Sequence, residues 1–145
     1  PNVPEQVAAL RLRAKLTPEQ AAAVDIRALE RFLSSPLAEE MRRVAAMERE
    51  YRFTVLMDAR DYDGMSVGGD EMLLQGVVDC CFETLEGITV VDFKTDRVDR
   101  RSVAARAEEY RPQLAAYSRA LEEITGKPVI RRCLWFFALD QAVDV

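Results

Sequence analysis

The sequence has no histidine among its 145 residues. That absence excludes Ser-His-Asp and Cys-His catalysis and the common zinc sites, unless another part of a longer chain supplies the imidazole. Cysteine is scarce as well: Cys80 and Cys81 are adjacent and Cys133 is distant, which is neither a disulfide framework nor a CxxC metal clip. Neighbouring strand residues point to opposite faces, so Cys80 and Cys81 cannot grip one ion together. We expect reduced thiols in a cytoplasmic protein.

Long apolar runs and a secretory start are also missing. No stretch approaches the roughly 20 apolar residues that span a bilayer, and the N-terminal PNVPEQ lacks the basic start and apolar run of a signal peptide. The chain starts with Pro1 rather than Met, so we expect it to be cut from a longer chain. An apolar fraction of 49% and a charged fraction of 31% predict about one globular domain with a real core.

The net charge of −5 argues against a free-standing nucleic-acid binder that relies on electrostatics. The charge is uneven, however, because residues 94–132 hold ten Lys and Arg against six Asp and Glu. This basic segment follows a segment with paired acids and would suit an anionic substrate. A solvated helix of mixed charge explains it equally well.

The order of the expected elements is helices, antiparallel hairpins, helix and strand. It predicts an α/β fold in which a small mixed β-sheet is flanked by helices. We expect one domain, with a helical segment 1–47 that packs on a core of residues 48–145. Pro112 should interrupt the last helix or open a second one, because proline lacks the N–H for a helical hydrogen bond. The expected helices cover 2–16, 17–33, 35–47 and 101–125, the strands 50–57, 72–83, 88–95 and 129–137, and a loop or hairpin connection 59–71.

Two aspartates occupy the centres of neighbouring apolar strands, where aspartate is rare and costly to bury. A four-residue turn over 84–87 would make Glu83 face Ile88 and would therefore place Asp79 opposite Asp92. By strict alternation, Asp79, Asp92 and Lys94 then share one face of the hairpin. On that face also lie Gln75, Val77, Cys81, Glu83, Ile88, Val90 and Asp96.

Two opposed carboxylates need a shared proton or a cation between them. Mg²⁺ or Mn²⁺ suits Asp79 and Asp92 best, because these hard ions take one or two carboxylates together with waters and substrate phosphate. Lys94 would then reach a phosphate oxygen or the attacking water, which favours metal-assisted phosphodiester hydrolysis. The competing interpretation is an exposed ladder of Asp92 and Lys94 with Asp79 as a chance acid on an edge.

Together, G76-V-V-D79, D92-F-K-T-D96 and Q113-L-A-A-Y117 resemble the RecB-type nuclease domain of the PD-(D/E)XK superfamily. Within it they are most similar to the C-terminal nuclease domain of AddA (RexA) helicase–nuclease subunits. R49-E-Y-R-F53 resembles the Glu-containing strand that precedes the first catalytic Asp there. The resemblance covers about residues 30–137.

The resemblance implies that Asp79, Asp92 and Lys94 are catalytic, with metal ligands from both aspartates and the Phe93 carbonyl. Gln113 and Tyr117 belong to the family's QxxxY motif, and their i,i+4 spacing puts them on one helix face together with Tyr110. These three would support the site or contact DNA, although the tyrosines could equally anchor the helix on the sheet. Glu50 is a further candidate site acid, or simply an exposed charge.

The resemblance also implies a histidine on a helix before the first motif, which this chain lacks. Either the chain begins after that helix, or it is a histidine-free variant. We expect a Mg²⁺-dependent DNA exonuclease domain acting on single strands delivered by a helicase motor, in double-strand-break repair and recombination, partnered by a second helicase–nuclease subunit. The alternative is a catalytically inactive nuclease-like module that binds DNA or a partner. A metal phosphatase for small molecules is a weaker third option.

Overall fold

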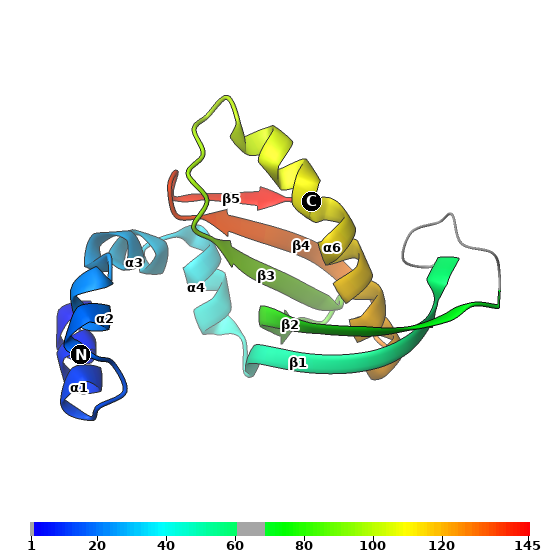
Figure 1. Ribbon diagram of the computed structural model, residues 1–145, viewed down its shortest axis with the longest axis horizontal. Coiled ribbons are helices and arrows are strands. Elements are labelled where there is room, and N and C mark those ends of the chain that lie inside the picture. Colours follow the sequence, from blue (N-terminus) through cyan, green and yellow to red (C-terminus); the bar gives the residue numbers. More distant parts are fainter. Residues whose placement is uncertain (1, 61–68) are drawn as a thin grey trace. The chain divides into compact units, whose positions relative to one another are not determined.

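The computed structural model describes residues 2–60 and 69–145, which divide into two compact units, Pro1–Arg42 and Arg43–Val145 (Figure 1). The division into a helical segment 1–47 and a core 48–145 stays a prediction; the first strand begins at Met47. Packing of the helical segment on the core stays a prediction. Most of the connection expected over 59–71 lies outside the described residues.

Four short helices make up the first unit, the last of them ending at its boundary with the second unit. Polar side chains cap the N-termini of these helices. The Thr17 hydroxyl accepts a hydrogen bond from the Gln20 N–H, and the Gln20 side chain accepts one from the Thr17 N–H, which completes a capping box. The single helix expected over 17–33 is wrong, because Val24 is extended and the Asp25 side chain caps a new helix at Ala28 N. The helices are α1 (Val3–Leu12), α2 (Pro18–Ala23), α3 (Ile26–Leu33) and α4 (Pro36–Arg43).

The second unit is a five-stranded mixed sheet with the order β1-β2-β3-β4-β5. The first three strands pair antiparallel, β3 and β4 pair parallel, and β5 returns antiparallel to β4. The expected α/β class with a small mixed sheet is confirmed. The edge strand β5 was not predicted from the sequence. The strands are β1 (Met47–Asp58), β2 (Glu71–Glu83), β3 (Ile88–Lys94), β4 (Val129–Phe136) and β5 (Gln141–Asp144).

Helix α6 (Val103–Thr125) connects the parallel strands β3 and β4 and crosses one face of the sheet (Figure 1). Leu114 and Leu121 are buried on it seven residues apart, the spacing of one helix face. The helix runs unbroken through Pro112, so the predicted interruption is wrong. Packing on both sides of the proline, by Ala107 and Leu114, offsets the lost backbone hydrogen bond.

The turn between β2 and β3 has the length that the sequence predicts. Thr84 and Gly87 exchange backbone hydrogen bonds of 2.8 and 3.3 Å, and Glu83 pairs with Ile88. A side chain at Gly87 would meet the Pro128 carbonyl at 2.5 Å, which explains the glycine. The register predicted for the hairpin is confirmed as far as Cys80 opposite Val91, where regular pairing ends.

Strict alternation along β2 is wrong, because Val78 and Cys81 pack in one core cluster although they are three residues apart. The change of face occurs where the β1–β2 register skips one position, between Arg49–Cys80 and Tyr51–Val78. At that position Glu50 has a φ of 48° and lies opposite Asp79 in sequence register. The interruption of both strands therefore lies at the first candidate metal ligand.

No helix in residues 2–60 or 69–145 combines the length and apolar character that crossing a bilayer requires.

Candidate active site

Asp79 and Asp92 meet where the β2–β3 ladder ends. The Asp79 carboxylate accepts a hydrogen bond of 2.8 Å from the backbone N–H of Phe93, replacing the next ladder bond with a side-chain bond. The Asp79 carboxyl lies close enough to Asp92 to raise the pKa of that carboxyl. The structure thus brings together the two aspartates that the turn length predicts to face each other.

Burial and the neighbouring carboxylate change the protonation of Asp92. Burial, as the larger cause, and then the adjacent Asp79 raise the pKa of Asp92 from 3.8 to about 6, and Lys94 offsets this only in part. The pair therefore carries more negative charge than its partly buried surroundings favour. A divalent cation would relieve that charge.

Lys94 lies on the same sheet face as Asp92, two residues further along β3. Its Nζ is 2.7 Å from Asp92 Oδ2, and the two side chains are only 16% and 14% exposed. Asp92 and Lys94 pair in register with Leu134 and Phe136, which pack against α6, so this is the helix-covered face. The exposed ladder that competed with a functional site is therefore wrong.

Tyr110 of α6 reaches this cluster. Lys94 Nζ lies 3.8 Å from the centre of the Tyr110 ring, and the Tyr110 hydroxyl donates a 2.7 Å hydrogen bond to Asp96 Oδ2. That bond is the main cause of the raised pKa of Tyr110, with burial next. Asp96 was not among the predicted site residues, although its alternation with Asp92 and Lys94 was a usable signal.

Gln113 and Tyr117 contact each other, as their spacing predicts, through a 3.2 Å hydrogen bond from Gln113 Nε2 to the Tyr117 hydroxyl. The Tyr117 ring packs edge-on against Phe53 at a centroid distance of 5.2 Å. A Cβ at Gly76 would lie 2.8 Å from the Tyr117 ring and 2.7 Å from Phe53, so only glycine allows this approach. Tyr117 thus anchors α6 on the β1–β2 hairpin, while the Gln113 side chain is exposed.

Glu50 is exposed and lies in the strand next to Asp79. Its left-handed backbone is rare for a residue other than glycine and costs on the order of 1–3 kcal/mol. Its role as a site acid stays a prediction.

The donor set at this end of the sheet fits one hard divalent cation. Two adjacent carboxylates, Asp79 and Asp92, are what Mg²⁺ commonly takes from a protein when waters and a substrate phosphate complete its coordination. Among residues 2–60 and 69–145 no cluster of three or more His, Cys, Asp or Glu side chains offers a richer metal site. Asp79, Asp92 and the predicted Phe93 carbonyl are therefore the groups that would hold the ion.

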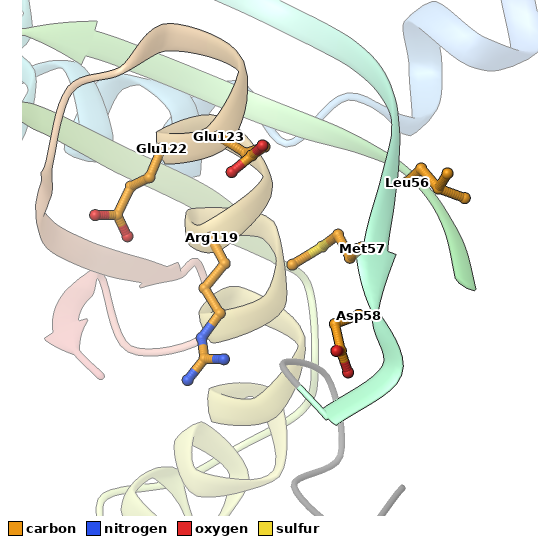
Figure 2. Close-up of a pocket in the computed structure, with 6 residues that line it drawn as sticks. All are labelled: Leu56, Met57, Asp58, Arg119, Glu122 and Glu123. Atoms are coloured by element: carbon orange, nitrogen blue, oxygen red, sulfur yellow. The ribbon is translucent and has the colours of Figure 1, made fainter. Parts of the chain in front are cut away.

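A separate hollow of about 480 Å³ lies between the end of β1 and the C-terminal half of α6 (Figure 2). Met57 points toward the helix from β1, whereas Leu56 points to the other side of the strand. Asp58 pairs with Arg60 at 3.0 Å, and the side-chain hydrogen bond from Arg60 lowers the pKa of Asp58 to about 2. This hollow lacks the paired carboxylates of Asp79 and Asp92, so its size does not make it the site of chemistry.

A small mixed sheet with a crossover helix, two neighbouring carboxylates and a lysine is the arrangement that the sequence predicts for a nuclease domain. The model of the PD-(D/E)XK nuclease superfamily matches residues 2–143. The chain therefore belongs to the PD-(D/E)XK nuclease superfamily, and the resemblance expected from its motifs is confirmed.

Two similar proteins of known name are both ATP-dependent helicase/nuclease subunits. An ATP-dependent helicase/nuclease subunit from Acetivibrio thermocellus is 41% identical over 126 residues, covering 84% of this chain and 10% of the relative. The protein of the same name from Bacillus cereus is 34% identical over 152 residues, covering 97% of this chain and 12% of the relative. The chain thus spans about a tenth of the length of these relatives and corresponds to a nuclease domain within them.

Among solved structures, the crystal structure of SSO0001 aligns with 99% of this chain and 61% of that chain, with a TM-score of 0.45 and 17% sequence identity.

Proposed function

We propose that the chain is a Mg²⁺- or Mn²⁺-dependent DNA exonuclease domain of an ATP-dependent helicase–nuclease subunit. The observation that carries this proposal is the placement of Asp79, bonded to the Phe93 N–H, next to the Asp92–Lys94 pair, in a chain of the PD-(D/E)XK superfamily. The substrate is single-stranded DNA delivered by a helicase motor, in double-strand-break repair and recombination. A second helicase–nuclease subunit is the partner, and the compartment is the cytoplasm.

The residues of the chain have distinct tasks in this reaction. Asp79 and Asp92 would hold the cation, with the Phe93 carbonyl as a third ligand. When bound, the ion supplies a water of lowered pKa and neutralises charge on the phosphate. Lys94 orients the attacking water or a phosphate oxygen with its N–H donors, and its charge favours the extra negative charge of the transition state. Gln113, with Tyr117 behind it, contacts the DNA strand.

The test is made in the intact protein that carries this domain. Asp79→Ala and Asp92→Ala should each lower Mg²⁺-dependent release of nucleotides from linear DNA by about 10²–10⁴-fold, since each removes a metal ligand. Glu83→Ala, at the other end of β2, is the matched control and should leave the rate within about twofold. Unchanged cleavage in both aspartate variants would overturn the proposal.

An inactive nuclease-like module that binds DNA or a partner is the second candidate, and the absence of histidine favours it. The two candidates differ in metal binding. An active site of this kind should give a saturable rise in thermal stability with Mn²⁺, whereas a module without a metal site should give none.

A further inference from the structure

The end of the Lys94 side chain is held on two sides. Asp92 Oδ2 lies 2.7 Å from Nζ, and the centre of the Tyr110 ring lies 3.8 Å from it. An ammonium over an aromatic face is attracted by the ring's negative centre, by about 0.5–2 kcal/mol depending on desolvation. Lysine otherwise has four flexible torsions, so the ring face restricts where its N–H donors point.

The Tyr110 ring is itself fixed from its far end. Its hydroxyl donates a 2.7 Å hydrogen bond to Asp96 Oδ2, and the same oxygen lies 3.6 Å from Arg106 Nε. A hydrogen bond to a carboxylate is roughly twice as strong as one between neutral groups. The ring also packs against the apolar cluster that joins α6 to β4. The Asp96 bond therefore fixes the ring's orientation, and packing fixes its depth.

These contacts close a loop between strand and helix. Asp96 follows Lys94 by two residues where the chain leaves β3, and Tyr110 returns from α6 to touch both. The Asp96 carboxylate accepts the hydrogen bond from Tyr110 and lies near Arg106. It is connected to the paired carboxylates indirectly, because Tyr110 contacts Lys94 and Lys94 contacts Asp92.

We infer that Asp96 and Tyr110 are positioning residues for Lys94, together forming a clamp that holds the ammonium beside the paired carboxylates. The inference rests on the proposed nuclease function. It assigns Tyr110 to the lysine and not to the DNA strand, and it adds Asp96 to the residues on which the reaction depends. A loosened clamp lowers the fraction of correctly oriented Lys94 and so slows the chemical step without weakening DNA binding.

The first experiment measures kcat and KM for DNA cleavage in the intact protein. Asp96→Ala and Tyr110→Phe remove the same hydrogen bond, so each should lower kcat by about tenfold and leave KM within about twofold. The double variant should be no slower than the slower single variant, since the two changes act on one contact. Asp96→Asn keeps an oxygen that accepts from the phenol and should restore kcat to within about threefold.

Two control variants separate these effects from general ones. Glu109→Ala removes another carboxylate that pairs with Arg106, at 2.9 Å, without touching Tyr110. Tyr51→Phe removes a phenol hydroxyl elsewhere in the sheet. Both should leave kcat within about twofold.

The second experiment does not depend on activity. NMR of the isotopically labelled, metal-free chain should show the Lys94 Cε protons shifted upfield by the ring current of Tyr110. Tyr110→Leu should abolish this shift, and Asp96→Ala should reduce it. An unshifted Lys94 in the unmodified chain, or an unchanged shift in Asp96→Ala, would overturn the clamp.

The kinetic outcomes distinguish the two hypotheses. If Asp79→Ala and Lys94→Ala abolish cleavage but Asp96→Ala keeps its kcat, the clamp is wrong and the nuclease proposal stands. A raised KM with unchanged kcat in Tyr110→Phe, or additive losses in the double variant, also overturns the clamp. If Asp79→Ala and Lys94→Ala leave cleavage intact, the proposed function fails, and the NMR result alone decides whether Asp96 and Tyr110 hold the lysine.

Discussion

Two lysine–carboxylate pairs lie at opposite ends of the β2–β3 hairpin with the same Nζ–O distance of 2.7 Å. Lys94 pairs with Asp92 at one end, and Lys127 pairs with Glu83 beside the turn at the other. The first pair is 16% and 14% exposed, whereas the second is 51% and 53% exposed. The first also has a second carboxylate near enough to raise the pKa of Asp92 and an aromatic ring 3.8 Å from Lys94 Nζ. The same distance therefore occurs in a half-buried cluster that is the candidate active site and in a solvated surface pair, and the surroundings distinguish the two.

The comparison is tested most severely by removing each lysine. Lys94→Ala should lower DNA cleavage by about 10²–10⁴-fold in the intact protein, because it removes a charge directed at the reacting phosphate. Lys127→Ala should leave the rate within about twofold. Equal losses in both variants would mean that general charge, and not the Lys94 site, supports the reaction.

The pH dependence of stability should also separate the two ends. The folded pKa of Asp92 is about 6 and its ordinary value 3.8, so its favourable contribution to folding is complete below pH 4 and is lost as the pH rises through 6. Asp92→Asn should therefore raise the free energy of unfolding of the metal-free chain at pH 8 by about 1–3 kcal/mol. Chemical denaturation at pH 5 and pH 8 measures this difference.

Glu83→Gln is the matched control, since it neutralises the exposed carboxylate. Its effect on stability should be small and similar at the two pH values. A gain at pH 8 as large as that of Asp92→Asn would contradict the distinction between the two ends.

Metal binding should select the same end of the hairpin. At a Mn²⁺ concentration ten times the dissociation constant, the chain should gain about 1.4 kcal/mol of stability, seen as a saturable rise in Tm. Asp79→Ala should abolish the rise, and Glu83→Ala should retain it. A rise that survives in Asp79→Ala would place the ion elsewhere.

The exposed pair should contribute least. Lys127→Ala should change the free energy of unfolding by about 0–1 kcal/mol, because both side chains are solvated. The small effect should shrink further at high salt, where surface charges are screened. A loss of several kcal/mol that persists in concentrated salt would show that the pair stabilises the fold more than its solvent exposure predicts.

Much of this arrangement follows from short-range rules. The turn over 84–87 determines the hairpin register, and the register brings Asp79 to Asp92. The caps at Thr17 and Ser35 were predictable from side-chain oxygens that accept from backbone N–H groups three residues on.

What sequence reasoning missed depends on tertiary contacts. Pro112 stays inside α6 because packing on both sides holds the helix, which no local rule includes. Strand β5 is four residues long and pairs with β4, too short for an alternation signal. The change of face at Asp79 coincides with the irregular backbone of Glu50, which lies in the neighbouring strand and far earlier in the chain. The role of Asp96 depends on the fold of α6, which places the Tyr110 hydroxyl within hydrogen-bonding distance of its carboxylate.

The change of face near Asp79 limits how the β1–β2 hairpin can change in length during evolution. Along β2, the core-facing side chains before Asp79 have even residue numbers and those after it odd ones, as Val78 and Cys81 show. One residue inserted or deleted between Gly76 and Asp79 would move the side chains of β2 before that point to the opposite sheet face. Gly76 would then no longer lie under the Tyr117 ring. Length variation among proteins with this site should therefore avoid the stretch between Gly76 and Asp79.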